Sequence, residues 1–481
     1  MNYSMVFKTI GRIVGAEALL LLLPAAVSLM YGEYSVFYAF LISSLAALAL
    51  CVLLSVVFRP RSKVIYAKEG FAIVALAWIG MSVFGALPFI ISGEIPNIVD
   101  AFFETVSGFT TTGASILVDV EAMSRGLLFW RSFTHWIGGM GVLVFVMALL
   151  PNLTDRSIHI MRAEMPGPVV GKLVPRAKDT AKILYLIYIA MTVLETVLLL
   201  AGGMSLFDSV VHAFGTAGTG GFGIKADSIA SYSPYVQWVI TAFLLMFGIN
   251  FNLYYLILIG RARSALKSTE LWAYLGIVAA SVCAIAVNIR SMYTGFAEVI
   301  RHSAFQVASI ITTAGFATTD FDLWPGLSKA ILLILMFIGA CAGSTGGGIK
   351  VSRIVLMGKM VFNELRFMVR PRSVNTVRFE GKTVDGTTQK SVANYFLIYI
   401  ICFFLIFLVI SFEPFGFESN FSAVAACFNN IGPGFAAVGP NANFAGYTAF
   451  SKLVLSFAML LGRLEIFPLI IAFSPRTWTK R

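Results

Sequence analysis

Four short segments of the chain each end an apolar stretch of about a dozen residues with small and polar residues around glycine. Glycine allows the backbone to leave a helix, and backbone outside a helix presents carbonyl oxygens without helical partners. A ring of such oxygens can replace the hydration shell of an alkali cation. Cation binding by backbone is therefore the chemistry to expect of these segments. They are Thr110-Thr111-Thr112-Gly113-Ala114, Ala217-Gly218-Thr219-Gly220-Gly221, Thr312-Thr313-Ala314-Gly315-Phe316 and Ile431-Gly432-Pro433-Gly434-Phe435.

The glycines of these segments define a degenerate repeat. We align Gly113, Gly220, Gly315 and Gly434, at separations of 107, 95 and 119 residues. Phe207 and Phe421 each lie thirteen residues before their glycine in this alignment. Phe214 and Phe428 each lie six residues before it. Each unit is expected to hold an outer helix, a half-helix with a glycine loop, and an inner helix.

The composition indicates which solvent surrounds these elements. Of the 481 residues, 58% are hydrophobic and 12% are charged, and the mean hydropathy is +0.86. A soluble domain carries about 25% charged residues. Lipid is therefore the expected solvent, and a soluble enzyme is excluded. A dozen helical residues span only about 18 Å of a bilayer core about 30 Å thick, so the four segments are expected to enter the membrane and return.

Ten further apolar stretches reach or approach the length of a membrane span. Their centres lie near residues 22, 47, 82, 139, 194, 248, 280, 340, 402 and 460. The sequence thus predicts an all-α polytopic membrane protein with four pseudo-repeats around one ion path and an added N-terminal hairpin. The expected units are a transmembrane hairpin at 1–66 and pore repeats at 67–178, 179–265, 266–390 and 391–481.

Lys and Arg are distributed unevenly among the loops. Of the 35 basic residues, 27 fall on one side of the expected topology. Basic loops stay in the cytoplasm, so both termini are expected there. Topology and attraction to anionic lipid headgroups account for the net charge of +11, and nucleic acid is not an expected partner. Two basic stretches, 151–182 and 359–391, exceed what a connector needs and are candidates for docking a cytosolic partner.

The third inner helix is interrupted by a glycine-rich segment. Consecutive glycines are costly in a helix, so the segment is expected to unwind below the filter loops and to act as a gate. A kinked helix of small residues is the alternative. A phosphate-binding loop requires Gly-Lys-Ser or Gly-Lys-Thr, whereas Ile349 separates Gly348 from Lys350. The candidate gating residues here are Gly343, Ser344, Thr345, Gly346, Gly347, Gly348 and Lys350.

Arg463 lies near the centre of the last apolar stretch, where a charge costs about 2.5 to 3.5 kcal/mol on insertion scales. We expect it to form an electrostatic barrier below the filter and to hold the glycine loop. Pairing with Glu465 within one helix is not expected, because residues two apart do not share a face. For Lys350, snorkelling to the cytoplasmic surface is the simpler interpretation. For Glu104, the simpler interpretation is that its negative charge complements the dipole of its half-helix.

Cysteines and histidines show no metal-like or catalytic pattern. The cysteines lie singly in apolar surroundings, so we expect buried thiols. The four histidines are scattered along the chain and do not supply the clustered groups of a membrane-embedded enzyme. A pure scaffold is a further alternative, although packing alone does not require four glycine turns. The cysteines are Cys51, Cys283, Cys341, Cys402 and Cys427.

Three further motifs, taken with the glycine loops, resemble the pore subunits of bacterial Trk-type potassium uptake systems. The resemblance covers residues 67–472, and the N-terminal hairpin resembles the TrkH and TrkG branch of the Trk/Ktr/HKT superfamily. It implies a homodimer in the bacterial inner membrane, with one ion path per protomer. It also implies a cytosolic TrkA-type regulator that binds a nucleotide (ATP/ADP or NAD/NADH), while no cofactor is expected on this chain. The motifs are His135-Trp136-Ile137-Gly138-Gly139-Met140-Gly141, Gly343-Ser344-Thr345-Gly346-Gly347-Gly348-Ile349-Lys350 and Gly462-Arg463-Leu464-Glu465.

The same resemblance assigns a selectivity filter. In related plant transporters a serine at the first filter position goes with sodium transport, so Gly113 favours potassium. The implied function is potassium-selective uptake gated by the glycine loop and Arg463 under a cytosolic regulator, with no enzymatic activity. Proton- or sodium-coupled potassium symport through the same pore is the alternative. The implied filter residues are Thr111, Thr112, Gly113, Thr219, Gly220, Thr313, Ala314, Gly315, Gly432, Pro433 and Gly434. Those expected to bind K⁺ are Thr112, Gly113, Thr219, Gly220, Ala314, Gly315, Pro433 and Gly434.

Overall fold

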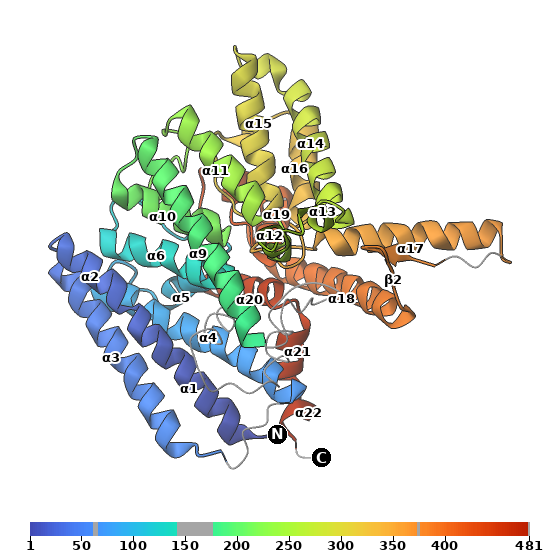
Figure 1. Ribbon diagram of the computed structural model, residues 1–481. Coiled ribbons are helices and arrows are strands. Elements are labelled where there is room, and N and C mark those ends of the chain that lie inside the picture. Colours follow the sequence, from blue (N-terminus) through green and yellow to red (C-terminus); the bar gives the residue numbers. More distant parts are fainter. Residues whose placement is uncertain (61–65, 142–176, 373–375, 480–481) are drawn as a thin grey trace.

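The computed structural model describes residues 1–60, 66–141, 177–372 and 376–479. Within these ranges the chain is built of helices and one two-stranded hairpin (Figure 1). The prediction of an all-α membrane protein with an N-terminal hairpin and four helical units is confirmed. The α-helical membrane segments follow from the composition, because hydrocarbon offers backbone groups no other hydrogen-bond partners.

The N-terminal hairpin packs on the first helix of the first unit. α1 (Tyr3–Leu20) and α2 (Leu22–Met30) form one apolar span, and α3 (Tyr34–Val57) returns beside it. Both α1 and α3 contact α4. The Ser44 hydroxyl donates to the Ala18 carbonyl over 2.7 Å, so this buried hydroxyl is satisfied between α3 and α1.

Each of the four units begins with a long outer helix. These helices have 20 to 26 residues and expose large apolar side chains on one side, as helices facing lipid do. They are α4 (Ala67–Ser92), α9 (Ala177–Ala201), α14 (Thr269–Asn288) and α18 (Gly386–Ile410).

A half-helix follows each outer helix. The half-helices have 12 to 16 residues, too few to cross a bilayer. An acid in the first turn of each complements the positive end of the helix dipole. The side chains of Asn97 and Ser205 cap the first two half-helices. The elements are α5 (Ile98–Phe109), α10 (Leu206–Gly218), α15 (Phe296–Ile311) and α19 (Phe417–Phe428).

The inner helices do not cross as straight spans. α11 (Pro234–Phe247) and α12 (Phe251–Leu258) meet at 90°, and α20 (Ala449–Arg463) and α21 (Phe467–Phe473) meet at 119°. α6 (Arg125–Gly139) ends two residues before the described range stops, and α16 (Gly326–Phe337) is separated from α17 (Val351–Val369) by a loop. Six described helices can cross a membrane, or eight if each bent pair counts once, so ten uninterrupted spans are not observed.

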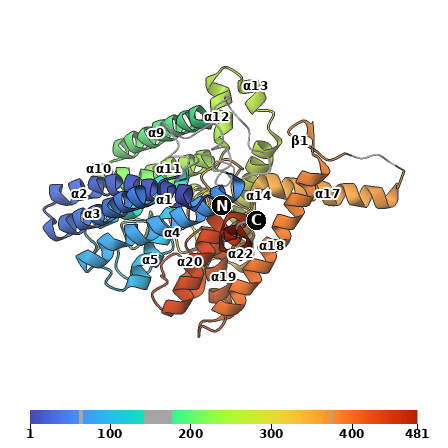
Figure 2. The same cartoon turned by 90° about the horizontal axis from the view of Figure 1, so that it is seen from below.

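Short elements connect these units, and both termini lie together. The Tyr3 ring stacks on Trp478 with the ring centroids 6.0 Å apart, so the two ends of the described chain share one side of the fold (Figure 2). The short elements are α13 (Ala262–Ala265), α22 (Pro475–Trp478), the 3₁₀ helices η2 (Arg290–Met292), η3 (Phe321–Leu323) and η4 (Ala436–Val438), and the strands β1 (Arg378–Phe379) and β2 (Lys382–Thr383).

The cysteines only partly match the expected buried thiols. Cys341 and Cys427 are buried, and Cys51 and Cys402 are half-buried. Cys283 is exposed on α14, where its side chain lies among apolar neighbours on the outer surface of the fold. For Cys283 the prediction is wrong, because an apolar sequence context in a membrane helix does not distinguish a face that packs on protein from one that faces lipid.

Candidate ion pathway

All four half-helices end in the same backbone turn. A residue with positive φ follows the helix, its N–H donating to the carbonyl three residues back, and the next N–H reaches five residues back. This pair of bonds is the Schellman motif, in which the left-handed position usually holds glycine. The left-handed residues are Thr111 (φ 55°), Thr219 (φ 53°), Thr313 (φ 60°) and Asn430 (φ 58°). The residues bonded five back are Thr112, Gly220, Ala314 and Ile431.

The repeated turn corrects the register expected from sequence. The glycine two residues after each left-handed residue is Gly113, Gly221, Gly315 and Gly432, all with positive φ. Gly221 therefore takes the place assigned to Gly220, and Gly432 takes the place assigned to Gly434. The phenylalanine spacings do not reflect structural equivalence. A Thr-x-Gly pattern, with Asn replacing Thr in the fourth loop, was the available sequence signal.

The two displaced glycines have local packing roles. A Cβ on Gly220 would lie 2.3 Å from the ring of His135, whose Nδ1 donates to the Gly108 carbonyl over 2.8 Å. Gly220 thus leaves room for a buried histidine between the first two loops. A Cβ on Gly434 would lie 2.7 Å from the Ser422 hydroxyl, which is a side-chain contact.

The four loops close into a ring through glycine and carbonyl contacts. A Cβ added to Gly113 would lie 2.0 Å from the Gly220 carbonyl oxygen, so glycine is required for this approach. The same geometry joins the second loop to the third, the third to the fourth and the fourth to the first. Among the described residues no hydrogen bond to these oxygens is formed. The ring carbonyls belong to Thr112, Gly220, Ala314 and Ile431.

An outer cavity lies above the ring. All four positive-φ glycines line it, whereas Gly220 and Gly434 do not, which supports the corrected register. In the fourth loop Pro433 lines this cavity above the ring carbonyl of Ile431. The expected K⁺ positions Thr112, Gly220 and Ala314 therefore coincide with ring carbonyls, and Ile431 replaces Pro433 and Gly434 as the fourth.

A buried ion pair supports the outer side of the ring. Glu104 accepts from the Arg131 guanidinium at 2.7 Å and from the Ile116 N–H at 3.0 Å. The guanidinium also lies 4.0 Å from the centre of the Phe222 ring. The pair thus ties the segment after the first loop to the segment after the second. Glu104 lies mid-helix in α5, so the expectation that it only complements the helix dipole is wrong.

We expect Glu104→Gln to destabilise the protein by about 3 kcal/mol, because it leaves the buried Arg131 charge without its counter-charge. The apparent melting temperature of the purified protein, followed by size-exclusion chromatography after heating, measures the effect. Glu364→Gln, which neutralises an exposed acid on α17, is the matched control. A melting temperature for Glu104→Gln equal to that of this control contradicts the assigned role.

The glycine loop between α16 and α17 lies directly beneath the ring. The Gly347 N–H donates to the Thr313 hydroxyl over 2.7 Å, below the turn of the third loop. A Cβ on Gly347 would lie 2.5 Å from the Asn429 carbonyl, beside the fourth. The Cys341 N–H donates to the Gly248 carbonyl over 3.0 Å, at the break between α11 and α12. The loop is therefore held between the lower sides of three units.

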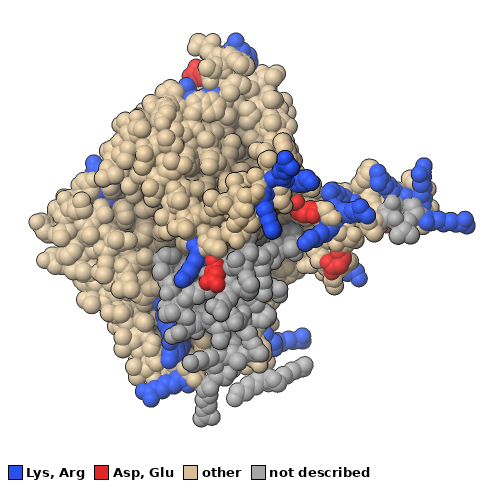
Figure 3. Space-filling view, viewed as in Figure 1, with Lys and Arg blue, Asp and Glu red and all other residues tan. Residues whose placement is uncertain are grey.

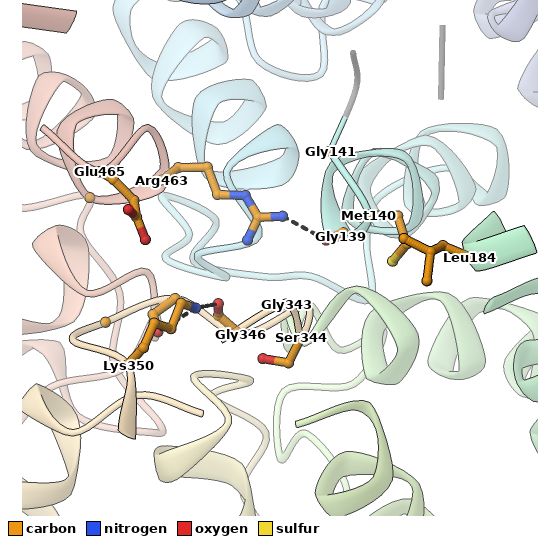
Figure 4. A pocket seen from close by; sticks show the side chains of 13 residues that line it. Gly139, Met140, Gly141, Leu184, Gly343, Ser344, Gly346, Lys350, Arg463 and Glu465 are labelled. Carbon is orange, nitrogen blue, oxygen red and sulfur yellow. Dashed lines mark hydrogen bonds between the residues drawn. The ribbon is translucent and has the colours of Figure 1, made fainter. Parts of the chain in front are cut away.

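Two cations secure the glycine loop (Figure 4). Lys350 is buried and its ammonium group donates to the carbonyls of Gly346 and, over 3.1 Å, Gly347. Lys350 does not snorkel to the surface, because the folded loop supplies these acceptors within the protein. Arg463, the last residue of α20, donates to the Thr345 carbonyl over 2.8 Å and to the Gly139 carbonyl over 2.7 Å. Arg463 therefore joins the loop to the end of α6.

Glu465 has a partner that sequence reasoning missed. It forms a bidentate pair with Arg353 of α17 at 2.6 and 3.1 Å, and not with Arg463. Glu465 and Ile466 both have positive φ in the turn between α20 and α21. The partners are 112 residues apart, so no local spacing could have indicated the pair. A small inner cavity is lined by glycines of the loop, by the end of α6, and by Arg463 and Glu465.

Comparison with known proteins agrees with this geometry. The family model for TrkH, described as a cation transport protein, matches residues 38–276 and 277–480. The chain is 37% identical to the Trk system potassium uptake protein TrkH of Escherichia coli K12, covering 98% of this chain and 99% of that protein. It is 34% identical to TrkG of the same organism, covering 97% of each chain. The crystal structure of the potassium transporter TrkH from Vibrio parahaemolyticus matches with a TM-score of 0.89 and 33% identity over 100% of both chains. The chain belongs to the TrkH family of cation transport proteins.

Proposed function

We propose that this chain is the potassium-conducting pore subunit of a bacterial uptake system. The observation that carries the proposal is the closed ring of carbonyls from four equivalent turns, with a cavity on each side. The relatives at 37% and 34% identity are named potassium uptake proteins. In the proposed pathway an ion loses its water in the outer cavity and is held by the carbonyls of Thr112, Gly220, Ala314 and Ile431.

The orientation of the half-helices supports selection of a cation. Each half-helix directs its C-terminal end toward the ring, and a helix C-terminus carries about half an elementary negative charge. Four such ends and a ring of carbonyl dipoles favour a cation and oppose an anion without an ionised acid at the ring. In this proposal size selection between potassium and sodium comes from the ring, whose diameter the close glycine contacts maintain.

The proposed gate is the glycine loop with its two cations. The loop contacts the underside of the third and fourth turns, so its position determines whether the ring opens to the inner cavity. Lys350 and Arg463 place two positive charges beside this route. In the closed state they oppose the passage of a cation, and displacement of the loop would remove its contacts with both side chains.

The proposed setting is the bacterial inner membrane, with both termini in the cytoplasm and two copies forming a homodimer. A TrkA-type regulator that binds ATP/ADP or NAD/NADH is the proposed cytosolic partner. Its candidate docking stretch 359–391 includes most of α17, and Figure 3 shows Lys and Arg side chains gathered along the projecting end of that helix. Most of the other candidate, 151–182, lies outside the described residues.

Reconstitution of the purified chain in liposomes tests the function. With a potassium gradient and no proton gradient, we expect potassium flux at least about tenfold above sodium flux, as a carbonyl ring that discriminates by about 1.4 kcal/mol would give. Flux that appears only with an imposed proton or sodium gradient would favour coupled symport through the same pore. Equal potassium and sodium flux contradicts the filter. The cytosolic partner with nucleotide is added in a parallel sample, so that a closed gate is distinguished from an inactive pore.

A further inference from the structure

One carboxylate holds both ends of the glycine loop. Glu270, in the first turn of α14, is buried and accepts the Ala342 N–H at 2.7 Å and the Ser352 N–H at 3.0 Å on the same oxygen. Ala342 directly precedes the glycine-rich part of the loop, which begins at Gly343, and Ser352 lies in the first turn of α17, where an N–H has no helical acceptor. Glu270 therefore joins the two ends of the loop to a helix outside it.

A second carboxylate ties the same helix end to the cytoplasmic hairpin. Glu380, at the tip of the hairpin, accepts from the Ser268 hydroxyl at 3.0 Å and from the N–H of Glu270 at 3.1 Å. Ser268 is the N-cap of α14 and accepts the Leu271 N–H at 3.3 Å. A continuous line of hydrogen bonds thus runs from Glu380, through the first turn of α14, to both ends of the glycine loop.

The turn that carries Glu380 has an unusual residue for its geometry. Phe379 pairs with Lys382, so Glu380 and Gly381 form a two-residue hairpin turn, and their φ angles are 50° and 73°. Such a turn prefers Asn or Asp followed by Gly. A glutamate in the left-handed region is a local cost, and here its longer side chain reaches Ser268. The Glu380 side chain is therefore better explained by its contact with α14 than by the backbone preference of the turn.

The hairpin also packs on the helix that leaves the loop. Val377 and Phe379 form a small apolar cluster with Leu356 of α17 and Val392 of α18. The Lys359 ammonium of α17 donates to the Arg378 carbonyl over 2.8 Å. A displacement of the hairpin would therefore move α17 through the packing contacts and α14 through the hydrogen bonds of Glu380.

We propose that the hairpin Arg378–Thr383 controls the glycine loop through Glu380 and Glu270, with Glu270 as the positioning residue of the loop. Glu380 is exposed, so a cytosolic partner on this face can reach it, whereas Glu270 is buried. Breaking the Glu270 link frees the loop from α14, whereas breaking the Glu380 link frees the first turn of α14 from the hairpin, and both favour displacement of the loop from the ring. This inference rests on the proposed gating function, and its test uses a readout that does not need ion movement.

The buried thiol of Cys341 reports release of the loop. In a variant that keeps only this cysteine, labelling by a small charged methanethiosulfonate reagent measures how often the loop opens. We expect Glu270→Ala to label about tenfold faster than the parent, since two hydrogen bonds to a charged group are lost. Glu380→Asn, which suits the turn but cannot reach Ser268, is expected to label about threefold faster, because water competes for the exposed carboxylate that it replaces.

Arg476→Gln, which neutralises an exposed charge outside both candidate docking stretches, is the control and should label at the parent rate. The double variant Glu270→Ala with Glu380→Asn should match Glu270→Ala alone, because the two links act in series. Additive effects in the double variant, or a parent rate for Glu380→Asn, would overturn the proposal. The variants are labelled in liposomes, and potassium flux is measured on the same samples. Absence of flux from every sample, with or without the partner, would refute the proposed function, while the labelling rates would still test the hydrogen-bonded route.

Discussion

Gly113→Ser should abolish the preference for potassium over sodium. The added Cβ would lie 2.0 Å from the Gly220 carbonyl oxygen, so a ring ligand must move. The residue must also hold φ at 81°, which costs a non-glycine residue about 1 to 2 kcal/mol. Because about 1.4 kcal/mol corresponds to a factor of ten, we expect the permeability ratio to fall by about tenfold or more. Liposome flux measured separately with potassium and with sodium provides the ratio.

Two control variants distinguish the effect of the contact in the ring from the effect of backbone strain. Gly93 has the same φ of 81° as Gly113 but has no atom within 4 Å of an added Cβ, so Gly93→Ser carries the strain without the contact. It should leave the ratio unchanged. Gly434→Ala tests the register, because its Cβ would meet Ser422 and Val438 of the fourth unit, whereas a Cβ on Gly432 would meet backbone of the first loop. If Gly434→Ala lowers selectivity as much as Gly432→Ala, the corrected register is wrong.

Much of the architecture followed from the sequence because a bilayer leaves few options. The local composition indicates how long an apolar span is, whether its backbone must be helical, and on which side Lys and Arg lie. These criteria predicted the outer helices, the half-helices and the N-terminal hairpin. The breaks between α11 and α12 and between α20 and α21 were harder to predict from the sequence. The apolar stretches of these inner helices are nearly continuous in sequence, yet α20 turns by 119° into α21 at Leu464–Ile466, where the local signals are only the flanking Gly462 and Pro468.

The filter register shows where alignment by residue type is insufficient. The second and fourth loops each contain more than one glycine within five positions, so glycine content alone could not identify the one at the ring. The decisive signal was conformational, since Thr219 and Asn430 occupy the left-handed position of the turn. The Thr-x-Gly pattern carries that information only when the turn is known. In the second loop the extra glycine, Gly220, accommodates His135 from the inner helix of the first unit.

Long-range ion pairs were the other gap. Arg463 was considered in sequence with Glu465, but the observed partners of both charges come from other elements. Arg463 binds backbone of α6 and of the glycine loop, and Glu465 binds Arg353. Sequence could indicate that such charges must be compensated, because unpaired charge in a membrane is costly. Which group compensates them depends on tertiary structure.

Arg463→Ala is expected to raise partner-independent potassium flux. The substitution removes a unit positive charge beside the inner cavity and the hydrogen bond, 2.8 Å long, that ties the loop at Thr345 to α20. A unit charge about 4 Å from an ion is worth about 4 kcal/mol at an effective dielectric constant near 20. If the substitution lowers the energy barrier to the ion by only a third of this amount, the flux increases by about tenfold. Liposome flux of the chain reconstituted alone, normalised to the amount of reconstituted protein, measures the increase.

Arg463→Lys separates the two contributions of this side chain. Lysine keeps the positive charge but lacks the planar fork that reaches the carbonyls of Thr345 and Gly139 together, so its flux should lie between wild type and Arg463→Ala. Arg476→Ala, which removes an exposed charge near the C-terminus, controls for net charge and should match wild type. Wild-type flux from Arg463→Ala at normal protein levels would contradict both the barrier and the anchor, because either loss alone should increase conduction.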